Sequence, residues 1–529
     1  MPVLSRRHFL ATSAAAGLGL ATGLSTGTAR ATAPQQLQVT TRMLEVNGKA
    51  AKVFALLGPD GKPGLAFNRG ERFRVQLQNS LTDPTLIHWH GLTPPNASDG
   101  VPGLTQKALA AGASYEYDFP LAKAGTNFMH SHFGLQEQQL LAAPLILRDP
   151  AEAHLDEQEI VIQLHDFTFS DPTEIFASLQ KGMGHQMSEQ DIAAMQAQQM
   201  QMEHQQPGGM AHNMPGMDMS GGGMGDDPAQ SSGDMAQMMQ NMPGMQMPGA
   251  QMPGMSSSGM SGGMDLNDVK YDAFLANDRT YDDPEIVAVE RGGKLRLRII
   301  NAGAASNFMI DLGALSAKLI AVDGMPVEPV QDSQFAVAIG QRLDLRLQLP
   351  AEGGAFPVTA QLEGDRRRSA VILATKGATI GKLDFLAAKP TGRFDQLTGH
   401  LVAARDPLPA RPADRKLSLD LTGDMMRYRW GLALTNGITG LQVKQGERVE
   451  IEMVNRTAMS HPMHLHGHHF QLVAVNGKPV NGPLRDTHLV PATSSATIAF
   501  DADNPGRWAF HCHNLYHMVA GMMTELIYV

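Results

Sequence analysis

The chain has one cysteine, Cys512, among 529 residues. A single thiol excludes an intramolecular disulfide, so the chain is not a disulfide-stabilised scaffold. It also excludes a zinc site built from several thiolates. Any role of Cys512 must therefore be carried out without a second cysteine of the same chain.

Aromatic residues (5%) and charged residues (18%) are also few, and the net charge at pH 7 is −10. This charge argues against nucleic-acid binding, which needs a clustered basic surface. Beyond the extreme N-terminus, no apolar run approaches the roughly 20 residues of a membrane-spanning helix. The length predicts three to four domains at about 150 residues each.

Residues 1–31 have the layout of an export signal, with a positively charged start, a short apolar stretch and a small-x-small site at Ala29-Arg30-Ala31. The pair Arg6-Arg7 resembles a twin-arginine signal, which directs the export of folded proteins. An ordinary secretory signal is the alternative. We expect a mature chain that begins near Thr32 and works in the periplasm.

Methionine, in contrast, is abundant, and 20 of the 33 methionines fall within residues 183–264. This stretch, the Met-rich segment, contains seven acidic residues but no aromatic residue, lysine or arginine. Residues 188–204 look helical, and because such a composition buries little surface to offset the entropy of ordering, we predict that the rest of the segment is disordered. Thioether sulfur is a soft ligand that prefers Cu(I), so the segment is suited to collecting cuprous ions. A plain linker is the alternative.

The rest of the chain has the pattern of β structure. Short runs of alternating apolar and polar residues each follow a Gly-containing turn and precede an asparagine; they are residues 73–77 before Asn79, 294–299 before Asn301 and 448–453 before Asn455. One pattern at three places predicts an all-β chain with three copies of a Greek-key β-sandwich. The expected domains are residues 32–155, 156–385 (interrupted by the Met-rich segment) and 386–529.

Four His-x-His pairs dominate the polar motifs: His88-Trp89-His90, His130-Ser131-His132, His464-Leu465-His466 and His511-Cys512-His513. Side chains two residues apart on a strand point to the same face, so each pair presents two imidazoles together. Eight convergent neutral imidazoles indicate a transition-metal site, and imidazole suits copper, zinc and iron alike.

A second ligand set surrounds the cysteine. His461, Cys512 and His517 supply two imidazoles and a thiolate, and Met522 is placed as a weak axial thioether. This combination is the ligand group of blue-copper electron-transfer sites. Because Cys512 lies between His511 and His513 but points to the opposite strand face, it links the two metal sites covalently.

With these four motifs the chain resembles the multicopper oxidases over essentially its whole mature length except the Met-rich segment. The matching segments are His-Trp-His-Gly at 88–91, His-Ser-His at 130–132, His-Pro-x-His-x-His-Gly at 461–467 and the His-Cys-His…His…Met run at 511–522. The resemblance implies three cupredoxin-like domains, four copper ions per chain and an oxidase that reduces dioxygen to water.

The resemblance also implies a role for each ligand position. His461, Cys512, His517 and Met522 match the type 1 copper ligands, and His88 and His464 match the type 2 ligands. The six ligands of the type 3 pair are matched by His90, His130, His132, His466, His511 and His513. The type 1 site would then lie in the third domain and the trinuclear cluster between the first and third domains.

Within the family, Asp99-Gly100-Val101-Pro102-Gly103, the run 134–138 and the Met-rich segment resemble the bacterial copper-resistance oxidases, which oxidise Cu(I) to Cu(II). Two features depart from related cuprous oxidases. Thr457 stands where an acidic residue precedes the type 1 histidine, and the Met-rich segment interrupts the second domain instead of the third. The methionines nearest the ligand motifs, which either bind Cu(I) or pack in the core, are Met459, Met463, Met518 and Met523.

Reduction of dioxygen to water consumes protons, so an acid must serve the cluster. Asp99 matches the carboxylate that assists there in the family, and Glu137 is a second candidate; either could instead orient a ligand imidazole. We expect Asp486 to be a surface or loop-anchoring charge. His468, His469 and His488 match no ligand position.

Two other functions remain open from the sequence. A laccase-type oxidase of phenols or other organic reductants would use the same coppers but needs an open pocket at the edge of His461 and His517. A copper-binding or structural protein without catalysis would need a defect that the filled ligand positions do not show. A two-domain copper nitrite reductase is disfavoured by the length of the chain. The copper-resistance oxidase is the leading hypothesis. The partners it predicts are dioxygen, Cu(I) or a small organic reductant, and a periplasmic copper-handling protein.

Overall fold

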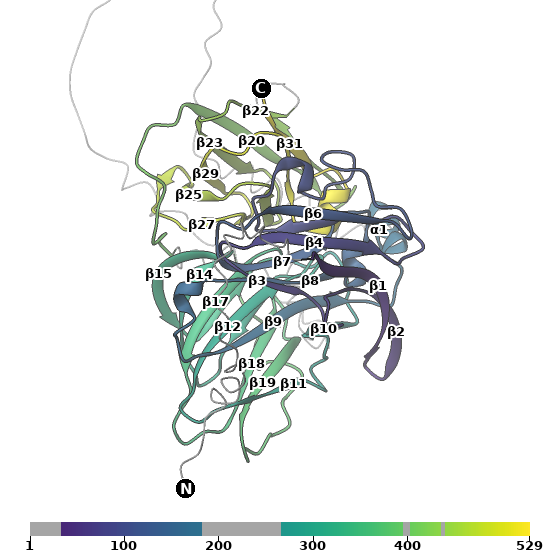
Figure 1. Cartoon of the computed structure of the whole chain (residues 1–529), viewed down its shortest axis with the longest axis vertical. Helices are drawn as coiled ribbons and strands as arrows, with labels where there is room; N and C mark the ends of the chain where they lie inside the picture. Colours follow the sequence, from purple (N-terminus) through teal and green to yellow (C-terminus); the bar gives the residue numbers. More distant parts are fainter. Residues whose placement is uncertain (1–32, 182–265, 395–401, 435–439) are drawn as a thin grey trace, which may run out of the picture.

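The computed structural model describes residues 33–181, 266–394, 402–434 and 440–529. The expected signal peptide and the Met-rich segment lie outside these residues. The described part forms six β-sheets that pair into three sandwiches, which confirms the all-β prediction. In Figure 1 the third sandwich (green to yellow) lies at the top and the second (teal) at the bottom, with the first (purple to blue) against both.

The first sandwich pairs two four-stranded sheets. One sheet has the order β2 (Lys49–Leu57), β1 (Gln35–Val46), β4 (Arg72–Asn79), β6 (Ser114–Pro120). The other has the order β3 (Leu65–Asn68), β8 (Ala142–Arg148), β7 (Gly125–Ser131), β5 (Ile87–His90). Short 3-10 turns lie at η2 (Asn96–Ser98), η3 (Gln136–Gln139) and η4 (Pro150–Glu152).

The second sandwich pairs a six-stranded and a five-stranded sheet. The first of these has the order β10 (Ala273–Ala276), β9 (Gln158–Phe167), β12 (Lys294–Asn301), β17 (Arg342–Gln348), β14 (Ala317–Val322), β15 (Met325–Asp332). The other has the order β11 (Glu285–Val289), β19 (Arg368–Thr375), β18 (Ala355–Leu362), β13 (Phe308–Asp311), β16 (Gln334–Val337). Helix α1 (Pro172–Gln180) follows β9 and begins at Asp171, whose carboxylate accepts hydrogen bonds from two main-chain N–H groups of the first turn.

The third sandwich pairs a seven-stranded and a five-stranded sheet. The larger sheet has the order β21 (Arg429–Leu434), β20 (Arg415–Asp424), β23 (Arg448–Asn455), β29 (Ser495–Asp501), β25 (Phe470–Val475), β26 (Lys478–Pro479), and β27 (Leu484–Arg485) also pairs with β25. The smaller sheet has the order β22 (Leu441–Val443), β31 (Met523–Tyr528), β30 (Arg507–Cys512), β24 (His461–Leu465), β28 (Thr487–Val490), and helix α3 (Leu515–Val519) follows β30.

The threefold repeat expected from the sequence is present in the strand pairing. The three repeated strands β4, β12 and β23 each lie between a parallel and an antiparallel neighbour: β1 and β6, β9 and β17, β20 and β29. Each repeat therefore uses the same topology around its central strand. The chain between the second and third repeats pairs first with the second sandwich, through bridges from Arg367 to Leu386 and from Val327 to Ala404. The domain boundaries stay a prediction.

The asparagine at the end of each repeated strand has the same function in all three sandwiches. The side-chain amide of Asn79 donates to three main-chain carbonyls, that of Asn301 to two and that of Asn455 to three. In each case the side-chain oxygen accepts from the N–H group two residues later. All three residues are buried, so these amides satisfy loop groups that would otherwise lose their hydrogen bonds.

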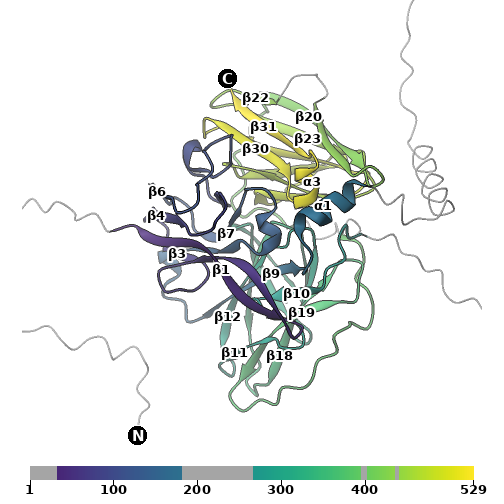
Figure 2. The ribbon, with the colours of Figure 1, turned by 90° about the vertical axis from the view of Figure 1, so that its right-hand side faces the viewer.

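Packing of the sandwiches sets where a site can form. One continuous hydrophobic cluster joins the second and third sandwiches, and a separate cluster fills the first. Figure 2 shows α1 and α3 lying close together beside the third sandwich. None of the helices among the described residues has the length and hydrophobicity needed to cross a lipid bilayer.

We expect Asn301→Ala to destabilise the protein by about 2–4 kcal/mol, because two buried carbonyls and one buried N–H group lose their partner. Urea unfolding followed by tryptophan fluorescence measures this change. Gln334→Ala, which removes a single exposed hydrogen bond, is the matched control. Equal stability of the two variants would contradict the role assigned to the repeated asparagine.

Candidate metal centre

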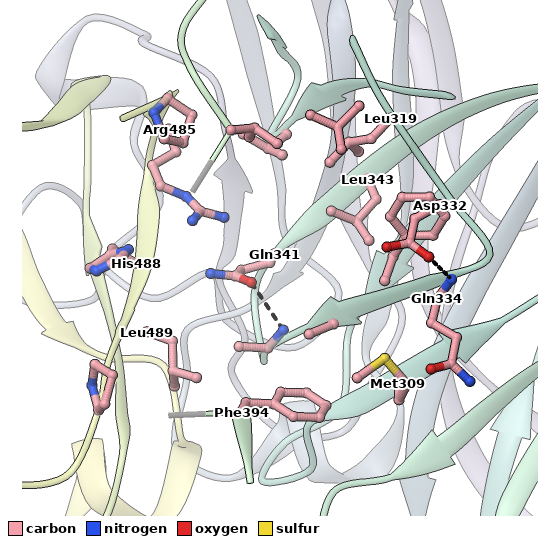
Figure 3. Close-up of a pocket in the computed structure, with 18 residues that line it drawn as sticks. Met309, Leu319, Asp332, Gln334, Gln341, Leu343, Phe394, Arg485, His488 and Leu489 are labelled. Atoms are coloured by element: carbon pink, nitrogen blue, oxygen red, sulfur yellow. Dashed lines mark hydrogen bonds between the residues drawn. The ribbon is translucent and has the colours of Figure 1, made fainter. Parts of the chain in front are cut away.

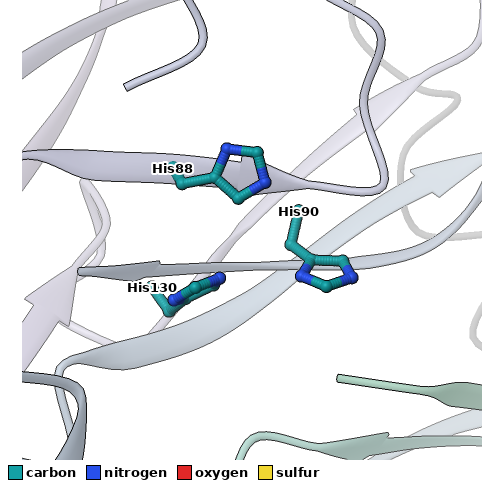
Figure 4. A group of neighbouring side chains, drawn as sticks. All are labelled: His88, His90 and His130. Atoms are coloured by element: carbon teal, nitrogen blue, oxygen red, sulfur yellow. The ribbon is translucent and has the colours of Figure 1, made fainter. Parts of the chain in front are cut away.

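The four His-x-His pairs meet where the first and third sandwiches pack together. Strand β5 carries the first pair and pairs with β7, so that His88 lies opposite His130. Strand β24 pairs with β30 in the same way and places His464 opposite His511. Figure 4 shows the rings of His88, His90 and His130, from β5 and β7, close to one another. Convergence of the eight imidazoles was predicted from their two-residue spacing, and the structure brings all four pairs together.

Within this group the ring nitrogens face one another at short range. The Nε2 atoms of His88 and His464 lie 3.4 Å apart, and Nδ1 of His90 lies 3.1 Å from Nε2 of His513. Nε2 of His511 lies 2.9 Å from that of His466 and 3.4 Å from that of His132. The remaining imidazole, His130, has a buried Nε2 without a hydrogen-bond partner in the described part of the chain.

The other nitrogen of most of these rings lies close to an oxygen. The distance is 2.9 Å in five cases: His88 to the Asp99 carbonyl, His90 to Asp486 Oδ1, His464 to the Asp486 carbonyl, His466 to Asp99 Oδ2 and His511 to the Cys512 carbonyl. A carbonyl or carboxylate oxygen only accepts, so the outer nitrogen carries the hydrogen and the inner nitrogen is a lone pair. Lone pairs pointed at one another across 2.9–3.4 Å are the arrangement that a cation stabilises.

Burial supports the same conclusion about protonation. It lowers the pKa of His90, His132, His464, His466 and His513 well below the ordinary value, and that of His511 to about 3. These imidazoles are neutral at neutral pH. Neutral imidazole is the form that binds a metal, so protons do not compete for the inner nitrogens.

The second predicted ligand set is assembled inside the third sandwich. Cys512 Sγ lies 3.7 Å from Nδ1 of His461 and 3.8 Å from Nδ1 of His517, and these two nitrogens lie 3.1 Å apart. Met522 is fully buried, and its carbonyl accepts from the Cys512 N–H at 3.0 Å. Burial raises the pKa of Cys512, so its sulfur is a thiol unless a metal displaces the proton.

The outer nitrogens of this set also lie close to oxygen atoms. Nε2 of His461 lies 2.7 Å from Thr457 Oγ1, and Nε2 of His517 lies 2.8 Å from Asp268 Oδ2. Asp268 also accepts hydrogen bonds from the Tyr428 hydroxyl at 2.8 Å and from Asn514 Nδ2 at 3.0 Å. The indole of Trp430 packs against both imidazoles, with centroid distances of 4.2 Å to His517 and 5.2 Å to His461.

The two predicted carboxylates lie beside the imidazole group. Asp99 is fully buried, and its two side-chain oxygens lie 2.9 Å from His466 Nδ1 and 3.3 Å from His88 Nδ1. The turn that holds Asp99 requires glycine next, because Gly100 has φ +86° and a Cβ there would lie 1.9 Å from the Ile87 carbonyl oxygen. Glu137 on η3 lies 3.3 Å from His130 Nδ1 through Oε2, and its other oxygen has no partner among the described residues.

Three buried residues at the site were not identified from the sequence. The expectation that Asp486 is a surface or loop-anchoring charge was wrong, because it is 1% exposed and contacts both His90 and His464. Arg342 pairs with Asp486 from the second sandwich, and Asp268 reaches His517 from the same sandwich. No local motif marks these residues, because each contact except that between Asp486 and His464 joins different sandwiches.

The neighbouring histidines and methionines lie apart from the two ligand sets or in the core. His468 is held by the His466 carbonyl and the Tyr528 hydroxyl, and His488 lines a cavity of about 250 Å³ between the second and third sandwiches (Figure 3). Neither His461 nor His517 lines this cavity. Met459 and Met463 are buried in the core, Met518 is half-buried and Met523 is exposed.

Comparison with known proteins identifies the fold and the family. Family models described as multicopper oxidase match residues 410–529, 38–152 and 242–380. The chain is similar to the solved structure of Fet3p, a multicopper oxidase that functions in iron import, with a TM-score of 0.67 at 17% identity over 93% of this chain and 90% of that one. It is also similar to the laccase from Botrytis aclada, with a TM-score of 0.66 at 20% identity over 93% and 87%. These structures confirm the three cupredoxin-like domains.

Sequence relatives include both copper-resistance proteins and laccases. Multicopper oxidase MmcO of Mycobacterium tuberculosis is 29% identical over 87% of this chain and 80% of its own length. Copper resistance protein A of Escherichia coli is 24% identical, with coverage of 91% and 90%. Laccase-2 of Botryotinia fuckeliana is 24% identical, with coverage of 93% and 81%. Three matched domains in one chain, together with the two ligand sets inside them, show that the protein is an oxidoreductase of the multicopper oxidase family.

Proposed function

We propose that the protein oxidises Cu(I) to Cu(II) and passes the electrons to dioxygen, as a contribution to copper tolerance. Four cuprous ions supply four electrons, which reduce one dioxygen with four protons to two waters. The observation that carries this proposal is the inward orientation of the imidazole lone pairs in the larger group. The thiol site lies next to this group, because its Cys512 directly follows His511 on the same strand. Copper bound there would supply one-electron transfer at the thiolate and dioxygen reduction at the imidazoles.

The residues present fit four copper ions per chain. The proposed type 1 ligands are His461, Cys512, His517 and Met522, and the proposed type 2 ligands are His88 and His464. The remaining six imidazoles fall into two sets, His132, His466 and His511 in one and His90, His130 and His513 in the other, as expected for a type 3 pair. Soft sulfur with imidazole suits a copper that cycles between two oxidation states, and all-imidazole sets suit the others.

Electron transfer between the two centres would follow the chain itself. Cys512 lies in β30 with its side chain toward His461, whereas His511 and His513 face the imidazole group. The thiol sulfur is therefore joined to both imidazoles only through the covalent bonds of three consecutive residues. We propose this segment as the route for electrons.

Asp99 and Glu137 are proposed to handle protons at the imidazole group. Asp99 accepts from His466 and lies close to His88, so it holds two imidazoles that belong to different ligand sets. Glu137 has one oxygen toward His130 and one free, buried oxygen, which leaves it able to hold a proton near the group. Full burial of both carboxyls means that any proton must arrive through ordered water or neighbouring side chains.

The contacts at His517 support Cu(I) as substrate. The acidic residue that is missing at Thr457 is supplied from the second domain by Asp268, which lies 2.8 Å from His517. Asp268 also follows the Met-rich segment by only four residues, so the chain leaves that segment at the edge of the thiol site. We propose that the segment collects Cu(I) and that the Asp268 carboxylate attracts the cation toward His517.

Oxidation of an organic reductant is the second candidate, favoured by the similarity to fungal laccases. A phenol must approach the edge of a type 1 histidine. Here the outer nitrogens of His461 and His517 are buried against Thr457 and Asp268, and Trp430 covers both rings. This covering supports a small ion over an aromatic donor.

We further propose that residues 1–31 direct export by the twin-arginine route to the periplasm, where the protein would encounter Cu(I).

Cys512→Ser should give a colourless protein that binds about one copper fewer than wild type and has no oxidase turnover, because the thiolate ligand is lost. Absorption spectroscopy and metal analysis measure these changes. Met463→Leu is the control, since Met463 lies directly opposite Cys512 on the neighbouring strand and is buried in the same core. A wild-type protein that never turns blue when loaded with copper would overturn the type 1 assignment.

Asp268→Asn should keep the blue colour but lower the turnover of Cu(I) at low concentration about 10- to 100-fold, the range typical for groups that hold a metal ligand. The asparagine keeps the shape of the side chain and removes its charge. Asp272→Asn, in an exposed turn nearby, is the control. Oxygen consumption is the measurement, and equal turnover in the two variants would contradict a role for Asp268 in accepting the cation.

Deletion of residues 183–264 should reduce oxygen consumption with low Cu(I) several-fold and leave the rate with a phenol nearly unchanged. A variant that keeps the length but replaces the methionines of this segment by leucine should behave like the deletion, because thioether sulfur is the ligand for Cu(I). If the phenol rate dominates in wild type and the deletion leaves Cu(I) turnover unchanged, the laccase-type function is the correct one.

A further inference from the structure

Arg342 is a fully buried cation whose hydrogen bonds reach all three domains. It lies on β17 of the second sandwich, and its Nε donates to the Thr126 carbonyl of the first at 3.0 Å. Within its own sandwich it donates to the carbonyls of Gly340 at 3.0 Å and Asp323 at 3.1 Å. Its two terminal nitrogens also donate to the two oxygens of Asp486 in the third sandwich, at 2.7 and 2.6 Å. All five N–H groups of the guanidinium are therefore used.

Asp486 connects Arg342 to two of the imidazoles, those of His90 and His464. Its Oδ1 lies 2.9 Å from Nε2 of His90, and its carbonyl lies 2.9 Å from Nδ1 of His464. The neighbouring hydroxyl of Thr487 donates to the same Oδ1 at 2.9 Å. Because both oxygens are held by a bidentate pair, the plane of the carboxylate is fixed, and so is the direction in which it accepts from His90.

The backbone next to His90 is fitted to the same guanidinium. Gly91 has φ +94°, and a Cβ there would lie 2.4 Å from Arg342 Nη2 and 2.2 Å from Asn127 Oδ1. Any larger residue would displace the guanidinium or the strand end that carries His90. Asp486 of the ion pair therefore contacts the His90 ring, and Arg342 lies against Gly91, the residue that follows His90.

We propose that Arg342 and Asp486 are positioning residues for His90, by which the second domain controls occupancy of the type 3 copper pair. The second domain contributes none of the twelve proposed ligands. Asp486 keeps the hydrogen of His90 on Nε2, so that Nδ1 is the lone pair that faces His513 at 3.1 Å. The proposal rests on the copper assignment made under the proposed function.

A purely structural role for the ion pair makes a different prediction. In that case its loss would weaken docking of the domains without a specific effect on one ligand. Arg485 offers a matched comparison, because it is the residue before Asp486 and joins the same two domains through Asp323 at 2.9 Å, with 11% of its side chain exposed. It makes no contact with an imidazole among those found in the described residues.

Two double variants of the full chain separate the buried charge from the hydrogen bond to His90. Arg342→Met with Asp486→Asn removes the ion pair but keeps an oxygen that accepts from Nε2. Arg342→Met with Asp486→Leu removes the ion pair equally and leaves only the Thr487 hydroxyl, 3.1 Å from Nε2, as an acceptor. Arg485→Gln is the control. Copper per chain, the blue absorption and the fraction of copper visible by EPR are measured after loading, since coupled Cu(II) pairs give no EPR signal whereas isolated Cu(II) does.

The Asp486→Leu double variant should lose about one to two of four coppers and show a larger EPR-visible fraction of the remainder, with the blue colour intact. The Asp486→Asn double variant should show a smaller loss of the same kind, because it keeps an acceptor whose direction the guanidinium no longer fixes. Arg485→Gln should match wild type. Four coppers per chain with an EPR-silent type 3 pair in both double variants would overturn the proposal. If a double variant does not fold, Arg342→Lys is measured instead, because lysine keeps the charge and loses the bidentate geometry. Unchanged copper content and an unchanged EPR-visible fraction would then overturn the proposal. A loss of copper restricted to the type 3 pair would support it.

A wild type that binds no type 3 pair would instead overturn the copper assignment itself. The blue absorption distinguishes the two failures, because the thiol site at Cys512 makes no contact with Arg342 or Asp486 among the contacts found in the described residues. Loss of blue colour in wild type concerns the proposed function, whereas a change restricted to EPR and copper content concerns His90.

Discussion

The hydrogen bond on the outer nitrogen of most of the imidazoles is the interaction on which the candidate metal centre depends. It decides which nitrogen carries the hydrogen and therefore which one is free to bind a metal. For His88, His464 and His511 the acceptor is a main-chain carbonyl. A carbonyl does not ionise, so the path of the backbone sets these tautomers wherever the imidazoles are neutral. The β-sandwich thus determines ligand chemistry as well as ligand position.

The two outer domains and the central one contribute in different ways. All proposed ligands come from the first and third sandwiches, which meet through β5, β7, β24 and β30. The second sandwich contributes Asp268 at His517 and Arg342 behind His90. It therefore contacts the outer side of both ligand sets. A domain without ligands is in this way still part of both sites.

Much of this arrangement was predictable because it depends on local spacing. The His-x-His pairs lie on strands, where residues two apart share a face, and the same rule places Cys512 opposite its neighbours. The repeated asparagine was visible as a pattern, although its amide contacts to loop carbonyls were not. Asp268, Arg342 and Asp486 were missed because the contacts that place them at the site come from other domains; Arg342 and Asp486, for example, are 144 residues apart. No periodicity links such residues, and a buried charge looks like a surface charge in a sequence.

Burial of Cys512 has a consequence for the chain before it receives metal. Oxidants and disulfides react with the thiolate, and here the sulfur is fully buried and its raised pKa keeps it protonated. The apoprotein is thereby protected against sulfenic acid formation and mixed disulfides, even in an oxidising compartment. Copper bound at the proposed type 1 site would displace this proton and make the sulfur a metal ligand. A chain that folds before it meets copper would therefore keep its only thiol intact until loading.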